Sequence, residues 1–509
     1  MGGILLIFKS MNLHNFPSEI RPFLLPKSQG NLVYQCLECG TEYPIEEFLY
    51  TCPKCQNIFM LPDKEFERLK EIDGKIWRQI FNYRKMLNIP ALKGIFLFHE
   101  FIAPIIPLED IVYLGEGHTS IVEANQYLQE LVGCRFYYKN DGQNPSASFK
   151  DRGMACALSY VNYLIHSKGL KEVLAICAST GDTSASAALY ASYLRGKVKS
   201  AVLLPQGKVT AQQMAQPLGH GAYVFEIPGV FDDCMKVVET LADNYHVVLL
   251  NSKNPWRIKG QESYSYEIAQ WFDYDLKNKV IIVPIGNAGN ITAIINGFLN
   301  FYKVGIIETL PKIIGVQSIH ANPVYRYYLE PDPKKRVWQP VKVKPSCAQA
   351  AMIGNPVSMP RVISSVEEYN KLAGKKQVFV VEVTEQAIMD WMLIANRNGH
   401  FACTQGGESL AGLVEALKEG IVNSEEEAIL DSTAHMLKFV SFQQMYFEDK
   451  FPPEYEVSPR EELKNIPQLV RPSDITYFPD EKILGPEEFK EFITKTARTI
   501  ADWLNLKKK

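Results

Sequence analysis

Short apolar runs rich in β-branched residues recur along most of the chain and constrain its fold more than any other feature. The runs are apolar at nearly every position, so the strands that they predict are buried on both faces. Helical patterns separate the runs, and strands that alternate with helices form parallel sheets covered on both faces. The runs lie at residues 173–177, 201–204, 246–250, 281–285, 312–316, 378–383 and 428–430. The sequence therefore predicts an α/β fold with parallel sheets.

Length and composition narrow the class of protein further. The 509 residues are enough for two or three domains, and 46% hydrophobic with 22% charged residues is typical of globular proteins. A formal net charge of -3 gives no electrostatic reason to expect nucleic acid or an anionic membrane as the main partner. The start MGGILLIFKS has an apolar run too short for the hydrophobic region of a signal peptide and no basic region before it, so we expect no secretion signal there. No run approaches the ~20 apolar residues of a membrane span. We expect a cytosolic protein that acts on small molecules.

Four of the ten cysteines form two knuckles near the N-terminus. Cys36 and Cys39 stand in CLEC, Cys52 and Cys55 stand in CPKC, and twelve residues separate the pairs. Each knuckle can direct two thiolates at one tetrahedral Zn²⁺, so the spacing predicts a structural zinc ribbon at 31–60. The alternative is a pair of turns without metal. The segment has few basic residues, which argues against a nucleic-acid surface. The other six cysteines are scattered and receive no role.

A glycine-rich loop, GNAGN, follows the apolar run 281–285 and precedes a helical pattern. A strand, a loop and a helix N-terminus form the setting in which backbone N–H groups and the helix dipole bind a phosphate. Glycines in such a loop let the backbone approach the phosphate closely. A purely structural turn is the alternative. The predicted phosphate-binding amides are those of Gly286, Asn287, Ala288, Gly289 and Asn290.

Eight stretches of the sequence form one ordered set of motifs. They are EGHTSIVEA, SASFKDRG, ASTGDTSASAALYA, NSKNPWRIKGQ, PIGNAGNITA, HANPVY, IGNPVSMPR and STAHMLKF. In this order they resemble the threonine synthases, which belong to the wider family of pyridoxal-phosphate (PLP) enzymes of fold type II, whose fold is that of the tryptophan synthase β chain. Eight matches in register, over roughly residues 111–440, are hard to explain except by common descent.

The resemblance implies roles for single residues. Lys150 matches the lysine that binds the PLP aldehyde and then moves protons at the substrate carbons. Thr433 matches the residue that bonds the pyridine nitrogen, where a hydroxyl need not keep that nitrogen protonated. A helix cap is the alternative for Thr433, and capping is also the alternative for the hydroxyls of the substrate set. The residues that match the family's binding site for the substrate phosphate are Ser179, Thr183, Asn251, Ser252 and Arg257.

Asp182 departs from the branch of the family that has asparagine beside the 3-oxygen of the ring. The plant-like branch reads STGDTSA, as here. A carboxylate beside a phenolate repels it unless one of them carries a proton. We therefore expect Asp182, within the cofactor site, to be displaced or protonated.

The same evidence predicts the organisation of the chain. The segment 63–87 has apolar residues at a spacing of three to four, which indicates one amphipathic helix packed on the body, and the chain ends in a further helical pattern. The two-domain arrangement, with the cofactor between the domains, is implied by the resemblance. The expected parts are a tail (1–30), the ribbon (31–60), a helical lead-in (61–110), a large PLP domain (111–165 and 281–440), a small inserted domain (166–280) and a C-terminal extension (441–509).

The resulting expectation is a homodimeric threonine synthase, which converts O-phospho-L-homoserine and water to L-threonine and phosphate. A second interpretation is a relative that uses O-phosphoserine in β-replacement, as a cysteate synthase or a cysteine synthase-like enzyme. The segment CTQGGESL (403–410) matches the family poorly and could signal that change of substrate. A third is a non-catalytic regulator that binds a partner through the ribbon. The intact Lys150 and glycine loop weigh against this last interpretation.

Overall fold

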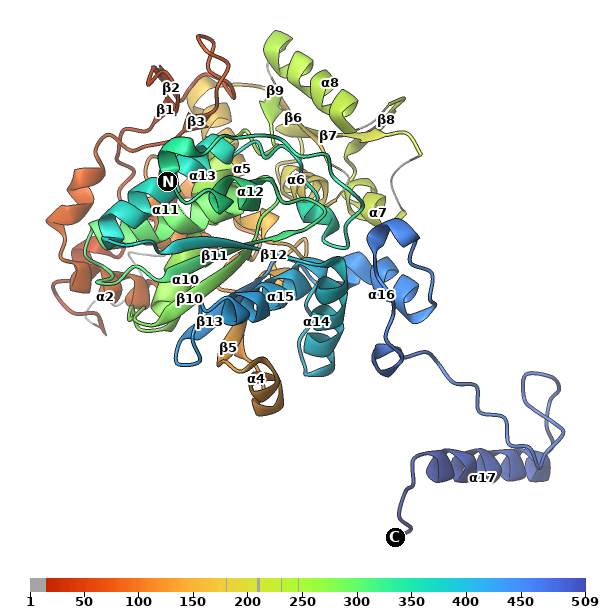
Figure 1. Ribbon diagram of the computed structural model, residues 1–509. Coiled ribbons are helices and arrows are strands. Elements are labelled where there is room, and N and C mark those ends of the chain that lie inside the picture. Colours follow the sequence, from red (N-terminus) through yellow and green to blue (C-terminus); the bar gives the residue numbers. More distant parts are fainter. Residues whose placement is uncertain (1–14, 180, 208–210, 230, 246) are drawn as a thin grey trace. The chain divides into compact units, whose positions relative to one another are not determined.

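The computed structural model describes residues 15–179, 181–207, 211–229, 231–245 and 247–509 (Figure 1). The chain divides into two compact units, Met1–Ser458 and Pro459–Lys509. The helices are α2 (Gly74–Arg84), α3 (His99–Ile102), α4 (Gln126–Val132), α5 (Lys150–Lys168), α6 (Asp182–Tyr193), α7 (Ala211–Gly219), α8 (Phe231–Asn244), α9 (Pro255–Gln261), α10 (Ser263–Trp271), α11 (Gly289–Lys303), α12 (Pro323–Leu329), α13 (Met359–Ala373), α14 (Glu385–Arg397), α15 (Thr404–Lys418), α16 (Val440–Phe447) and α17 (Pro486–Trp503).

The cysteine-rich segment forms a small antiparallel sheet in the order β2-β1-β3. Its strands are β1 (Val33–Cys36), β2 (Glu42–Pro44) and β3 (Phe59–Met60). Cys36 pairs with Phe59 across β1 and β3, and Tyr34 pairs with Tyr43 across β1 and β2. Strands this short bury little apolar surface, so the sheet relies on the body beneath it and on the cysteine cluster.

The prediction of one helix over 63–87 is wrong. A 3-10 helix (Phe66–Glu71) ends before Ile72, which is extended, and α2 starts afresh at Gly74. Asp73 caps α2 by accepting from Lys75 N at 2.8 Å. A Cβ on Gly74 would lie 2.0 Å from Gly305 O, so this turn must approach the body closely. The expectation that the segment packs on the body is confirmed, since Trp77, Ile80 and Phe81 of α2 are buried.

The larger sheet has six strands in the order β12-β11-β10-β13-β5-β4. Its strands are β4 (Ile121–Glu123), β5 (Phe136–Asn140), β10 (Lys279–Pro284), β11 (Lys312–Ser318), β12 (Val378–Val383) and β13 (Glu427–Ser432). All neighbours are parallel except β4 and β5. In Figure 1, α11 and α13 lie on one face and α14 and α15 on the other. The predicted parallel sheet, covered on both faces, is confirmed.

The smaller sheet has four parallel strands in the order β8-β7-β6-β9. They are β6 (Val173–Ala178), β7 (Val198–Pro205), β8 (Tyr223–Ile227) and β9 (Val247–Leu249). The sequence analysis missed β8, an edge strand in which no residue is fully buried. The whole sheet lies within 166–280. This arrangement is compatible with the predicted inserted domain, whose boundaries stay a prediction.

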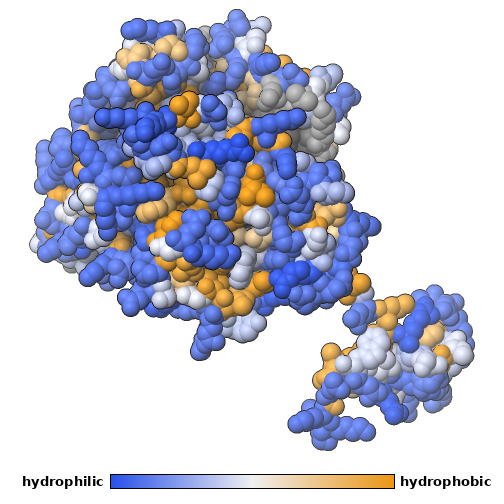
Figure 2. All heavy atoms as spheres, viewed as in Figure 1, coloured by the Kyte–Doolittle hydropathy of each residue, from blue (hydrophilic) through white to orange (hydrophobic). Residues whose placement is uncertain are grey.

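The second unit contains α17, which confirms the predicted end helix. Phe489, Ile493 and Ile500 lie on one stripe of α17 and are at least one third exposed. Figure 2 shows orange apolar side chains among blue hydrophilic ones on this unit. None of the described helices is long and apolar enough to cross a membrane.

Candidate active site

The predicted site residues all follow the carboxyl ends of neighbouring strands. In the larger sheet, the glycine loop follows β10, Thr433 follows β13, and the segment that leads to Lys150 follows β5. In the smaller sheet, Ser179 follows β6 and Asn251 comes shortly after β9. Strands β10, β13 and β5 are neighbours, as are β6 and β9. Ligands of parallel α/β sheets bind at this edge, so the topology gathers the predicted residues where a site is expected.

Lys150 is the first residue of α5, and two contacts fix the turn before it. Phe149 N donates to Thr433 O at 2.8 Å, and Ser148 forms an isolated bridge with Ala434. The half-buried Lys150 ammonium lies 4.0 Å from the centre of the Phe149 ring. Burial, with a further contribution from the Arg257 charge, lowers the pKa of Lys150 from 10.5 to about 7. A large fraction of this amine is therefore neutral at pH 7 and able to attack an aldehyde.

The glycine loop forms a tight cradle at the start of α11. Ala288 caps the helix with φ +59°, in the left-handed region. A Cβ on Gly286 would lie 3.0 Å from Ala351 Cα, and one on Gly289 would lie 3.1 Å from Ile258 Cδ1. Asn287 O accepts from Ser358 N at 3.0 Å, and Asn290 Nδ2 donates to Asp431 Oδ2 at 2.7 Å. The loop thus has a fixed backbone at a helix N-terminus, as a phosphate-binding loop requires, and its role toward the PLP phosphate stays a prediction.

Asp182 begins α6 and has a partner that the sequence analysis did not identify. Lys438 Nζ lies 3.0 Å from Asp182 Oδ1, and Ser148 Oγ donates to Asp182 Oδ2 at 3.0 Å. Lys438 also donates to Ser146 O and Gln216 Oε1, each at 2.9 Å. The expectation of a displaced or protonated Asp182 therefore omitted a third arrangement, the ion pair. An ion pair relieves the repulsion between this carboxylate and a nearby phenolate.

Arg257 and Asn251 present buried N–H donors that no group in the described part of the chain satisfies. The Arg257 guanidinium is 3% exposed, and its Nη1 donates to Leu250 O at 3.2 Å. Among the described residues, its Nε and the Asn251 Nδ2 have no acceptor. Burial lowers the pKa of Arg257 to about 10, and no carboxylate in the described part of the chain pairs with it. Buried donors without acceptors are costly, so their presence indicates a site for an anion.

The other predicted substrate residues lie nearby along the chain. Ser179, Thr183 and Ser252 are half-buried. Ser179 Oγ accepts from Gly181 N at 3.3 Å, which is a local turn contact. Thr180, in the same motif, lies outside the described residues. The side chains of Thr183 and Ser252 therefore keep their predicted role as an expectation.

Thr433 has a buried thiol beside its hydroxyl. Cys403 Sγ lies 3.7 Å from Thr433 Oγ1. Burial raises the pKa of Cys403 to about 11, so at pH 7 the thiol is neutral and able to donate a hydrogen bond. The sequence analysis gave Cys403 no role, because the sequence does not show which residue lies beside a single cysteine.

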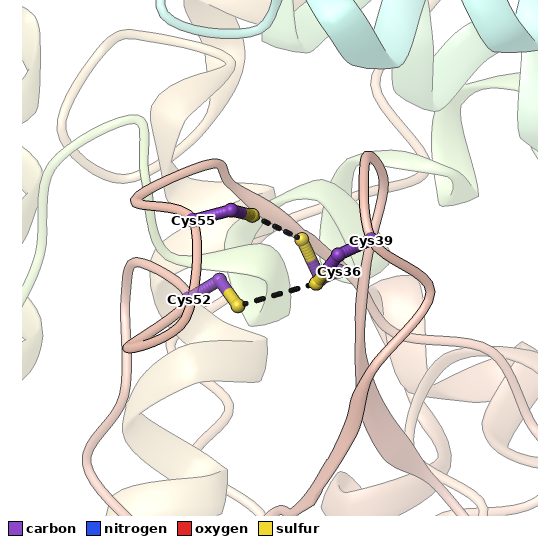
Figure 3. A group of neighbouring side chains, drawn as sticks. All are labelled: Cys36, Cys39, Cys52 and Cys55. Atoms are coloured by element: carbon purple, nitrogen blue, oxygen red, sulfur yellow. Dashed lines mark hydrogen bonds between the residues drawn. The ribbon is translucent and has the colours of Figure 1, made fainter.

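The four knuckle cysteines converge on one point (Figure 3). Cys36 Sγ and Cys55 Sγ lie 3.3 Å apart, Cys39 Sγ and Cys52 Sγ lie 3.6 Å apart, and all four sulfurs lie within 4.8 Å of one another. In a tetrahedral site with Zn–S bonds of about 2.3 Å, the sulfurs are about 3.8 Å apart. The four thiols therefore fit one tetrahedral metal ion.

Comparisons with known proteins identify the family of this chain. The family model described as pyridoxal-phosphate dependent enzyme matches residues 112–430. Threonine synthase from Methanocaldococcus jannaschii is 35% identical over 410 residues, covering 80% of this chain and 93% of the relative. Chloroplastic threonine synthase 2 from Arabidopsis thaliana is 32% identical over 431 residues, covering 84% and 78%.

Among solved structures, threonine synthase from Escherichia coli superposes with a TM-score of 0.59 at 20% identity, over 81% of this chain and 90% of that one. This similarity supports the fold, and the sequence relatives support the family. The chain belongs to the threonine synthase family of pyridoxal-phosphate-dependent enzymes.

Proposed function

We propose that this enzyme converts O-phospho-L-homoserine and water to L-threonine and phosphate. The observation that carries the proposal is a pair of buried donors, on Arg257 and Asn251, that have no acceptor among the described residues and lie in the same site as a lysine of lowered pKa. Those donors suit the phosphate of the substrate, and the glycine loop suits the phosphate of PLP. The similarity to threonine synthases favours this reaction over O-phosphoserine β-replacement and over a non-catalytic regulator.

PLP, when bound, supplies an electron sink for the carbanions of the reaction. In our proposal, the amides of Gly286 to Asn290 hold its phosphate, Thr433 bonds its pyridine nitrogen, and the Asp182–Lys438 pair lies beside its 3-oxygen. Lys150 would hold its aldehyde and, once displaced by the substrate, would remove the α proton and then the β proton. The residues that would hold the substrate phosphate while its bond to Cγ breaks are Arg257, Asn251, Ser252, Ser179 and Thr183. Water would then add its hydroxyl at Cβ, and protons would return to Cγ and Cα.

The lowered pKa of Lys150 predicts how apoenzyme captures PLP as the pH changes. Only the neutral amine attacks the aldehyde, so a pKa of about 7 makes the capture rate rise through pH 6 to 7 and level off above about pH 8. The measurement is stopped-flow absorbance of apoenzyme mixed with PLP. The control is Nα-acetyl-lysine, with an amine pKa of about 10.4, whose rate keeps rising to about pH 10. An enzyme rate that follows the control would contradict an amine of lowered pKa.

Arg257→Lys is expected to raise KM for O-phosphohomoserine about 10- to 100-fold. Lysine keeps the charge but loses the planar fork, and a hydrogen bond to a charged group contributes about 1.5–3 kcal/mol. Steady-state phosphate release measures KM and kcat, and the absorbance band of bound PLP is expected to stay unchanged. Arg195→Lys, at an exposed site in the same part of the chain, is the matched control. An unchanged KM would remove Arg257 from the substrate site.

We further propose that Cys36, Cys39, Cys52 and Cys55 hold one structural Zn²⁺. Four thiolates close the coordination sphere and leave no open position for catalysis. We also propose the division into a large domain (111–165 and 281–440) and a small domain (166–280), and a homodimer in solution. Light scattering after size-exclusion chromatography tests the homodimer, which requires about twice the chain mass of 57.7 kDa.

A further inference from the structure

We propose that the cysteine ribbon (31–60) holds the substrate loop (251–257) in position, with Arg361 and Trp256 as the positioning residues that join them. The inference rests on the proposed function, in which Asn251, Ser252 and Arg257 of the substrate loop bind the substrate phosphate. It assigns the ribbon a role in the reaction, without any contact between the ribbon and the substrate.

Arg361 of α13 joins the ribbon to the substrate loop through one fully buried guanidinium. Its Nε donates to Phe59 O of β3 at 2.8 Å. Its Nη1 donates to Ser252 O at 3.0 Å, and its Nη2 donates to Lys253 O at 2.8 Å. No carboxylate in the described part of the chain pairs with this cation, so backbone carbonyls of two separate segments solvate it. Ser358 Oγ also accepts from Arg361 Nη1, at 3.1 Å. Displacement of either segment would leave at least one N–H group of the buried cation without its acceptor, which couples their positions.

Trp256, next to Arg257, makes the second connection. Its Nε1 donates to the Tyr34 hydroxyl of β1 at 3.2 Å. Its ring stacks on Tyr160 with 3.9 Å between centroids and 14° between planes. The Tyr160 hydroxyl donates in turn to Ile45 O of the ribbon. Trp256 is 1% exposed and lies buried between the ribbon and α5, directly before Arg257 in the sequence.

A third connection is made by packing at the base of the loop. Tyr50 of the ribbon is 8% exposed and belongs to the same apolar cluster as Ile176, Ala178 and Leu249. Leu249 ends β9, two residues before Asn251. The ribbon therefore shares an apolar cluster with the strand that leads into the substrate loop, reaches the backbone of the loop through Arg361, and contacts the helix that carries Arg257 directly.

The cysteine cluster controls the ribbon groups that make these contacts. Tyr34 precedes Cys36 by two residues on β1, and Phe59 is the strand partner of Cys36. Closing the four thiols on one metal ion fixes the pairing of β1 with β3, and so fixes the Tyr34 hydroxyl and Phe59 O. Lys150 is anchored elsewhere, through Phe149 N on Thr433 O. Loosening the ribbon is therefore expected to weaken phosphate binding while PLP stays attached.

The first experiment compares Tyr34→Phe with the parent holoenzyme. The change removes the acceptor of Trp256 Nε1 and keeps the ring stacked on Phe59, at 5.5 Å. We expect KM for O-phosphohomoserine to rise about 5- to 20-fold, kcat to change less than about twofold, and the PLP absorbance band and zinc content to stay constant. Tyr369→Phe is the matched control, because this buried hydroxyl donates to Pro311 O at 2.7 Å, away from the ribbon and the loop. Equal KM values for Tyr34→Phe and the parent would overturn the inference.

The second experiment uses inorganic phosphate as a probe of the loop, which separates this inference from the proposed function. Calorimetry gives the phosphate Kd of parent holoenzyme, of Tyr34→Phe, and of holoenzyme stripped of metal by a chelator. Weaker phosphate binding in both altered proteins, restored in the stripped enzyme by added Zn²⁺, supports the inference. Parent-like binding in both refutes it and leaves the proposed function intact. A parent that neither binds phosphate nor forms threonine refutes both.

Discussion

Lys150→Ala is expected to lower threonine formation by at least ~10³-fold. A positioned base alone contributes about 10²- to 10⁴-fold, and Lys150 is also the proposed covalent anchor of PLP. Lys150 begins α5 beside Thr433 O, and its pKa is lowered to about 7 by burial and by the Arg257 charge. Steady-state assays measure the loss of turnover, and the shift of the PLP absorbance band reports the loss of covalent attachment.

Two controls make the Lys150→Ala result interpretable. Lys171→Ala removes an exposed lysine just beyond the end of α5 and is expected to leave activity and absorbance unchanged. Far-ultraviolet circular dichroism of Lys150→Ala is expected to match the parent, because no ion pair within the described part of the chain involves the Lys150 side chain, which lies against the adjacent Phe149 ring. A variant that folds, binds PLP and keeps more than about one tenth of the parent turnover would show that another residue is the base.

Cys36→Ser is the second change with a large expected effect. Structural zinc contributes about 10–16 kcal/mol of binding free energy to small zinc-binding peptides, which depend on it to fold. The ribbon has three short strands of four, three and two residues, so most of its order is expected to come from the metal. We expect the zinc content to fall from one per chain to below one tenth, and limited proteolysis to cut between residues 31 and 60.

Cys134→Ser is the matched control for the ribbon. It makes the same sulfur-to-oxygen change at a buried thiol that donates to Glu426 O at 3.1 Å, outside the cluster. Zinc content and the proteolysis pattern are expected to match the parent there. Full zinc content in Cys36→Ser would mean that the metal does not depend on this thiolate, and the proposed four-cysteine site would then be wrong.

Much of the fold could be predicted because local patterns determine it. Strands β10 and β11 are buried on both faces, and a continuous apolar run is their direct signature. The glycine loop could be predicted for the same reason, because its strand, loop and helix follow one another in the sequence. The exposed edge strand β8 and the break between Ile72 and Gly74 were missed. Strand β8 lies at a sheet edge without a fully buried residue, and Gly74 approaches Gly305 closely. Neither feature can be recognised from local periodicity.

Partners distant in sequence could not be predicted. Lys438 lies in STAHMLKF, a stretch that the sequence analysis quoted, yet its pairing with Asp182 depends on the way α6 meets the turn after β13. Arg361 lies in IGNPVSMPR, but its bonds to Phe59 O and Ser252 O join segments that are 302 and 109 residues away. A sequence shows that such side chains are present, and the fold alone decides what they touch.

The most direct test of the account is to give purified, PLP-loaded enzyme O-phospho-L-homoserine alone and identify the products by chromatography. The account predicts L-threonine and inorganic phosphate in equal amounts. Formation of 2-oxobutyrate, or no product from a protein whose PLP absorbance band is intact, would contradict it. In that case O-phosphoserine with sulfite or sulfide becomes the substrate pair to assay.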